Sequence, residues 1–270
     1  MSGVDWVVKN LGELQGDVLL FGGPYSNLQA SQAMLDIARK RGIAPQNRIC
    51  TGDVIAYFAD PVATLHLWRD ECELVAGNCE QQLGAGADDC GCGFEDGSAC
   101  DVLSKGWYAF ADRAVSRDDR LFMVDAPDLV VFTQVGRRYV VIHGGLSDVA
   151  QFLWPVSAKS EFLREISLVR GAVGQVDCII AGHCGMAFET QVDGVDWINV
   201  GVIGMPPHDG QPETRFAVLR DGCVKIETLN YDFGAVRLAM ERVGLVQGYE
   251  KTLQTGFWPS EDILPRSMRH

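Results

Sequence analysis

Four apolar runs in this chain each end close to a glycine paired with a polar residue, and this pattern limits how the chain can fold. The runs cover residues 47–50, 72–76, 139–142 and 178–181, and the pairs that follow them are Gly52-Asp53, Gly77-Asn78, His143-Gly144 and Gly182-His183. Each run is as short and apolar as a buried strand. Polar residues at the carboxyl ends of neighbouring strands meet at one edge of a sheet, where α/β proteins bind ligands. The sequence therefore predicts an α/β fold in which these polar side chains converge.

The converging side chains predict a metal site. Asp53 and Asn78 offer oxygen donors, and His143 and His183 offer imidazole nitrogens. This mixed donor set suits one divalent transition metal such as Mn, Fe, Ni or Zn. Taken singly, each residue has a plainer explanation, because a Gly-Asp pair after a strand is commonly a turn and a lone histidine commonly packs or caps.

Composition bounds the rest. The chain has 270 residues, with 23 Lys and Arg against 36 Asp and Glu, so its net charge is −13. Such acidity disfavours duplex nucleic acid as a partner. A bound metal makes the local field positive, so a small phosphorylated molecule or a phosphoprotein is still compatible with the sequence. No apolar run approaches the roughly 18 residues of a membrane span. The nine cysteines follow no secretory signal, so we expect a cytoplasmic protein with reduced thiols. The oligomeric state is left open.

Strand-like and helix-like segments alternate as far as His183, and short strands follow. Helices are predicted at residues 27–41, 61–71, 102–114, 117–124, 233–243 and 250–256, and late strands at 188–192, 197–200, 216–219 and 224–229. A stretch rich in Gly, Asp and Cys, at about residues 84–101, is predicted to be an inserted loop. We see no linker and expect one domain over residues 1–270.

The order of these motifs resembles the calcineurin-like metallophosphoesterase family. That family carries, in order, Asp-x-His, Gly-Asp-x-x-Gly, Gly-Asn-His-Asp/Glu, His and Gly-His-x-His. The matching segments here are Gly52-Asp53-Val54-Ile55-Ala56, Gly77-Asn78-Cys79-Glu80, His143-Gly144-Gly145 and Gly182-His183-Cys184-Gly185. The resemblance implies a four-layer αββα sandwich, in which two mixed β-sheets are flanked by helices, and a metal-dependent phosphoester hydrolase.

The departures from the family pattern fall on one of its two metals. Gly23, Tyr25 and Gly185 stand where the resemblance places the ligands private to the first metal. The ligands implied for the second metal, Asp53, Asn78, His143 and His183, are all kept. Losses sorted in this way predict a diverged member with one metal, in which Asp53 bridges no second ion.

Catalysis is expected to be weak in such a site. Cys79 stands where the resemblance implies a histidine that assists the leaving group, and a thiol is a poorer acid near neutrality. No Lys or Arg in the motif segments replaces the lost charge. Possible substrate contacts are Tyr25, Cys184 and His208, although Tyr25 can equally be packing that fills the emptied site.

Three functions therefore stay open. One is a one-metal phosphoesterase with low activity. Another is a pseudophosphatase that binds a phosphorylated ligand or partner without turning it over. The last is a metal or thiol sensor built on Cys79, Cys184 and the loop cysteines. Cys90, Cys92 and Cys100 lie close enough in sequence to hold a structural zinc, but they lack the Cys-x2-Cys spacing, and a flexible loop with incidental thiols is the alternative.

Overall fold

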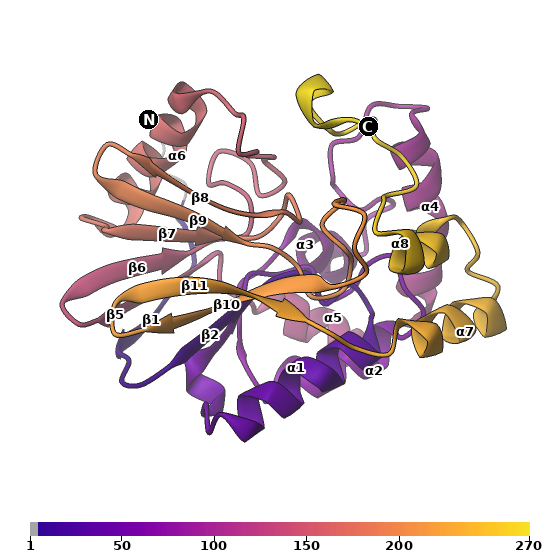
Figure 1. Cartoon of the computed structure of the whole chain (residues 1–270), viewed down its shortest axis with the longest axis horizontal. Helices are drawn as coiled ribbons and strands as arrows, with labels where there is room; N and C mark the ends of the chain where they lie inside the picture. The colour runs from indigo at the N-terminus through magenta and orange to yellow at the C-terminus, as the bar shows by residue number, and fades with distance from the viewer. Residues whose placement is uncertain (1–4) are drawn as a thin grey trace.

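Two mixed β-sheets form the centre of the computed structural model, which describes residues 5–270 (Figure 1). The six-stranded sheet has the order β1 (Val8–Glu13), β5 (Leu129–Gln134), β6 (Arg137–Val141), β7 (Cys178–Ala181), β9 (Val195–Val200), β8 (Ala187–Val192). The five-stranded sheet has the order β11 (Cys223–Leu229), β10 (Thr214–Arg220), β2 (Val18–Phe21), β3 (Arg48–Cys50), β4 (Glu73–Leu74).

The helices cover the outer faces of the sheets. Their bounds are α1 (Leu28–Lys40), α2 (Pro61–Arg69), α3 (Asn78–Ala85), α4 (Ala99–Ala114), α5 (Arg117–Val124), α6 (Lys159–Val173), α7 (Phe233–Val243) and α8 (Tyr249–Thr255). Figure 1 shows α1 and α2 below the five-stranded sheet and α6 above the six-stranded sheet, on the face that points away from the other sheet. These are the α/β fold and the four-layer sandwich that the sequence predicted.

Apolar alternation explains the layers. One cluster fills the space between the sheets and includes Leu20 of β2, Phe132 of β5 and Ile180 of β7, all fully buried. A second cluster joins the outer face of the six-stranded sheet to Phe162 and Ile166 of α6. A strand that is buried on both faces reads as a continuous apolar run, as Cys178–Ala181 of β7 does.

The site lies where parallel strand ends from both sheets meet. Strands β3 and β4 are parallel neighbours in one sheet, and β6 and β7 are parallel neighbours in the other. The backbone of Gly182 donates to the carbonyl of His143, which holds the ends of β6 and β7 together. The four polar residues singled out from the sequence follow these four strands.

Four features differ from the sequence prediction. Helices α3 and α6 were not predicted, although α6 covers the outer face of the six-stranded sheet. Strand β1 was not predicted, because its residues are exposed or half-buried and show no alternation; it pairs with β5 in parallel. Helix α3 reaches Ala85 and α4 begins at Ala99, so the irregular part of the loop is shorter than expected. A final segment after α8 extends to His270 and returns to α4, where the Ala99 amide donates to Asp262. Within residues 5–270, no helix is long and apolar enough to cross a membrane.

Candidate metal centre

Asp53 lies in a tight turn after β3. Its φ is +57°, and that of Gly52 is +107°, both in the left-handed region. A Cβ on Gly52 would lie 2.7 Å from the Gly77 amide nitrogen and 2.7 Å from the His143 ring. Only glycine fits this space, so it brings the turns after β3 and β4 into contact with His143.

Glu80 ties the same two turns together. This fully buried carboxylate accepts hydrogen bonds from the backbone amides of Asp53 at 2.7 Å, Val54 at 2.8 Å and Gly77 at 2.9 Å. Burial and the neighbouring Asp53 charge raise the pKa of Glu80 to about 7, although the amide donors act in the opposite direction. Glu80 therefore fixes the backbone that presents the candidate ligands.

His143 is held with one ring nitrogen facing the centre. Its Nδ1 donates to the Thr51 carbonyl at 2.6 Å, which leaves the lone pair of Nε2 free in the neutral ring. That Nε2 lies 3.1 Å from Asn78 Oδ1 and 2.9 Å from His183 Nδ1. A backbone carbonyl on the far nitrogen is the usual way in which a metal-binding histidine is oriented.

Asn78 is oriented by the inserted loop. Its Nδ2 donates to the Cys90 carbonyl at 2.7 Å and contacts Cys92 Sγ at 3.3 Å. These contacts fix which end of the amide is which. The oxygen Oδ1 therefore faces His143, and the loop contributes to the geometry of the site.

Together these atoms form a cage of acceptors. Asp53 Oδ2 lies 3.3 Å from His143 Nε2 and 4.0 Å from His183 Nδ1. Among the described residues, Asp53, His143 and His183 are the group of three whose ligand atoms all lie within 4.8 Å. Ligands that surround one ion at about 2.0–2.2 Å stand roughly 3 to 4 Å apart. The spacing and the donor chemistry of the cage therefore fit one divalent metal.

The protonation states of the cage groups depend on one another. For His143, burial acts to lower the pKa, but the adjacent Asp53 carboxylate outweighs it and raises the pKa. For Asp53, burial acts to raise the pKa, but the adjacent imidazoles outweigh it and lower the pKa to about 2. For His183, burial and the proximity of His143 lower the pKa to about 3. The carboxylate is thus ionised and the His183 ring is neutral, which are the forms that bind metals.

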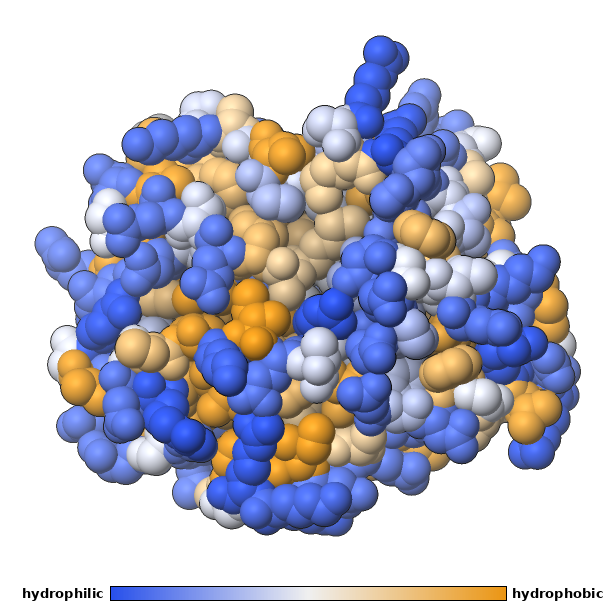
Figure 2. All heavy atoms as spheres, viewed as in Figure 1, coloured by the Kyte–Doolittle hydropathy of each residue, from blue (hydrophilic) through white to orange (hydrophobic). Residues whose placement is uncertain are grey.

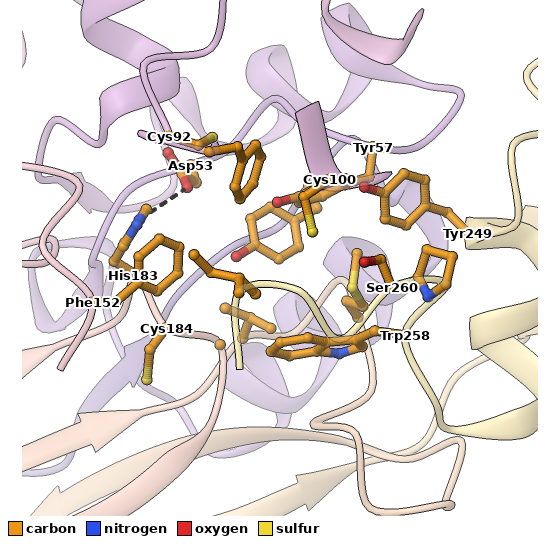
Figure 3. Close-up of a pocket in the computed structure, with 17 residues that line it drawn as sticks. Asp53, Tyr57, Cys92, Cys100, Phe152, His183, Cys184, Tyr249, Trp258 and Ser260 are labelled. Atoms are coloured by element: carbon orange, nitrogen blue, oxygen red, sulfur yellow. Dashed lines mark ion pairs between the residues drawn. The ribbon is translucent and has the colours of Figure 1, made fainter. Parts of the chain in front are cut away.

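A largely aromatic cavity opens from this cage (Figure 3). Asp53 and His183 stand at one end of it, and the ring of Phe152 lies over His183 with 4.2 Å between centroids. The far wall comes from the start of α4 and the final segment and includes Cys100, Trp258 and Ser260. The space for the centres of water molecules is about 60 Å³, several times the roughly 10–15 Å³ that one water needs.

Apolar groups crowd the positions where the resemblance implies ligands of another metal. A Cβ on Gly23 would lie 2.5 Å from Val202 Cγ1 and 2.6 Å from the ring of Tyr25. A Cβ on Gly185 would contact Trp258 at 3.5 Å. Tyr25 itself is buried against Tyr57, edge-on at 4.8 Å.

The other predicted contacts divide into two groups. Tyr25 and Cys184 line the cavity. Cys79 and His208 do not line it. Cys79 is buried beside Asn78 Nδ2 at 3.7 Å, and burial raises the pKa of its thiol well above the ordinary value. His208 instead anchors the final segment, since it binds Glu261 at 2.8 Å and accepts from the Trp258 amide at 2.8 Å.

The loop cysteines do not assemble as a zinc site. Cys90 and Cys92 are in contact, with 2.7 Å between their sulfurs. Cys100 lies instead at the start of α4, where it lines the cavity near Ser260. Over residues 5–270, the three thiols do not come within the 4.8 Å that would group them as ligands of one ion. The structural zinc is therefore not supported.

Several residues of the site carried no signal in the sequence. Phe152, Tyr249 and Trp258 lie in separate segments and reach the cavity only through tertiary packing. Thr51 acts through its backbone carbonyl, which any residue offers. Glu80 belongs to the Gly77-Asn78-Cys79-Glu80 motif, but nothing in the sequence showed that its carboxylate accepts hydrogen bonds from three backbone amides.

The fold is similar to the sandwich of solved metallophosphoesterases, and it carries a buried Asp-His-His group at its strand ends. A scan of protein-family models and a search of curated proteins find no match to the sequence. Among solved structures, a metallophosphoesterase from Sphaerobacter thermophilus is similar, with a TM-score of 0.69 and 15% identity over 90% of this chain and 100% of that one. A hypothetical protein from Pyrococcus horikoshii OT3 gives a TM-score of 0.72 and 15% identity over 89% and 98%. At this identity the likeness establishes the fold.

Proposed function

We propose that this protein is a phosphoester hydrolase that uses one divalent transition metal held by Asp53, Asn78, His143 and His183. The observation that carries the proposal is the convergence of four acceptor atoms, 2.9–4.0 Å apart where they face one another, at one end of a cavity. The metallophosphoesterase-like fold supports phosphoester chemistry. The substrate is proposed to be a small phosphorylated molecule; a phosphoprotein is the alternative.

The chain's own groups have separable tasks in this proposal. A bound divalent ion lowers the pKa of water and polarises a phosphoryl oxygen. Asp53 and His183 both face the cavity, so a ligand there meets the ion on their side. Asn78 and His143 complete the cage from behind, where the Cys90 and Thr51 carbonyls fix their orientation.

Low activity is expected from the same geometry. A two-metal site holds the attacking and leaving oxygens between two charges, whereas Gly23, Tyr25 and Gly185 offer no ligand pair for another ion here and Val202 crowds the position of Gly23. Cys79 lies outside the cavity lining and its raised pKa makes it a poor acid. The missing second ion and the missing acid are each expected to lower the rate at least tenfold, and each tenfold loss of rate corresponds to about 1.4 kcal/mol of activation barrier.

The proposal is tested by hydrolysis of aryl phosphates by the full chain loaded with Mn²⁺ or Zn²⁺. We expect slow, metal-dependent release of the aryl alcohol that His143→Gln abolishes. His66→Gln is the matched control, because His66 is an exposed imidazole on α2 that pairs with Asp119. Turnover that survives His143→Gln would contradict the proposal.

A pseudophosphatase is the second candidate, favoured by the crowded first-metal positions and the displaced Cys79. It predicts a metal-loaded chain that binds phosphorylated ligands without turnover. A metal or thiol sensor is favoured by one observation, the contact of Asn78 with Cys90 and Cys92. It predicts that mild thiol oxidation changes the metal content of the chain.

A further inference from the structure

We infer that the site selects a phosphodiester monoanion with apolar ester groups over a phosphomonoester dianion. The inference rests on the proposed function, because it takes the ion to be held by the cage around Asp53. It is argued from the charge and the chemistry of the cavity wall.

The cavity wall offers little positive charge. Of the 17 residues that line it, all within the described part of the chain, none is a lysine or arginine, and Asp53 is the one carboxylate. A divalent ion and the Asp53 carboxylate sum to +1, because a histidine that binds a metal does so as the neutral imidazole. One negative charge on the ligand therefore brings this end of the cavity to neutrality.

A monoester dianion would be left uncompensated. A phosphomonoester carries close to two negative charges above its second pKa of about 6, whereas a diester carries one. The second charge would lie among aromatic side chains, with no cationic side chain in the lining to pair with it. Burying a charge without a partner is strongly unfavourable, so the monoester loses affinity relative to the diester.

The basic residues near the cavity are already engaged. Arg215 pairs with Asp209 at 2.6 Å and donates to two backbone carbonyls. Arg269 donates to the carbonyls of Leu264 and Asp262, both at 2.9 Å. Neither arginine lines the cavity.

The wall that faces the cage fits apolar ester groups. The rings of Tyr25, Tyr57 and Tyr249 follow one another at centroid distances of 4.8 and 4.7 Å. Phe152 and Trp258 close other sides. The exterior differs, since Figure 2 shows hydrophilic residues over most of the viewed face. Aromatic surface binds aryl or alkyl groups through their apolar area.

The test is calorimetric titration of the Mn²⁺-loaded full chain with diphenyl phosphate and with phenyl phosphate at pH 7.5. We expect diphenyl phosphate to bind at least tenfold more tightly. The variant Ser260→Lys places an ammonium on the half-buried rim and is expected to reduce this ratio at least threefold. Ser260→Gln adds a neutral side chain at the same position and is expected to leave the ratio unchanged.

The outcomes separate this inference from the proposed hydrolysis. Equal or tighter binding of phenyl phosphate, or no binding of either compound, would overturn the inference. Turnover is measured in parallel with bis(4-nitrophenyl) phosphate and 4-nitrophenyl phosphate. If the diester binds preferentially but neither compound is hydrolysed, the hydrolase proposal fails and the ligand class stands. If the monoester is hydrolysed faster, the hydrolase stands and the ligand class is wrong.

Discussion

At the scale of single residues, Gly23 marks the clearest departure from a two-metal site. Its φ is +41°, and a Cβ there would collide with Val202 and Tyr25. Installing an aspartate at this position therefore needs more than the exchange of one residue. Restoring Asp at 23 together with His at 25 and 185 would remove the Tyr25 ring but would still require the Val202 side chain to move.

Gly23→Ala should lower the free energy of unfolding by about 1–3 kcal/mol, through overpacking and backbone strain. Gly12→Ala is the matched control, because Gly12 also has a positive φ, +71°, but has nothing within 4 Å of the added Cβ. Urea unfolding of both variants measures the difference. Equal losses would mean that the space beside Gly23 is not filled.

Glu80→Gln should destabilise the chain by about 1–3 kcal/mol, because an amide group would turn a donor toward backbone amides that now have an acceptor. The affected amides belong to Asp53, Val54 and Gly77. Glu241→Gln, at an exposed position on α7, is the control and should change little. Urea unfolding checks both, and an unchanged midpoint for Glu80→Gln would contradict the tethering role.

At the scale of elements, apolar runs and hydrophobic periodicity carried most of the prediction, and the caps seen in the structure agree with it. Helices α5 and α7 have the bounds expected from the sequence, because α5 has a Ser116-Asp119 capping box and α7 is capped by Asp232. Strand β1 was missed, since its faces do not differ in burial. The final segment was missed as well, because its contacts with His208 are formed only in the tertiary structure.

Strand positions read from the sequence could locate the four residues of the cage but not the residues of the cavity wall. Asp53, Asn78, His143 and His183 each follow a strand, and the topology of parallel strands brings strand ends together. The aromatic wall comes from distant segments with no common spacing. The displacement of Cys79 from the cavity also had no signal, because side-chain direction on the first turn of α3 depends on how the loop packs.

Asp119→Asn on α5 should lower stability at neutral pH by about 1–3 kcal/mol. Burial alone would raise the pKa of Asp119, but hydrogen bonds from Ser116 and the adjacent His66 outweigh it and lower the pKa to about 2. A lowered carboxyl pKa stabilises the fold above the unfolded value of about 3.9, and this contribution is lost as the pH falls toward 2. The difference in the free energy of unfolding between wild type and Asp119→Asn should therefore become smaller below about pH 4.

Urea unfolding at pH 7, 5, 4 and 3 follows that gap. Asp118→Asn is the control, since Asp118 is the exposed neighbour on the same turn. A gap that stays constant from pH 7 to pH 3 would show that ionised Asp119 does not stabilise α5.

At the scale of the whole molecule, the cage joins both sheets. Asp53 and Asn78 follow strands of the five-stranded sheet, and His143 and His183 follow strands of the six-stranded one. A ligand held by all four links the two halves of the sandwich. Since binding to the folded state alone stabilises it, metal binding should raise the stability of the whole domain.

Adding metal to the chelated chain should raise its unfolding free energy by about 2.7 kcal/mol when the free metal is 100 times its dissociation constant. Scanning calorimetry with and without metal measures the shift in Tm. His183→Gln should remove most of that shift, whereas His66→Gln should keep it. A shift retained by His183→Gln would place the metal elsewhere.

The account depends most on the number of ions that the chain holds, which elemental analysis of the purified full chain measures directly. We predict one equivalent of a divalent transition metal per chain after dialysis against metal-free buffer, and less than a fifth of that, on the order of background, in His143→Gln. Two equivalents per chain would contradict the one-metal site, and so would a full equivalent retained by His143→Gln.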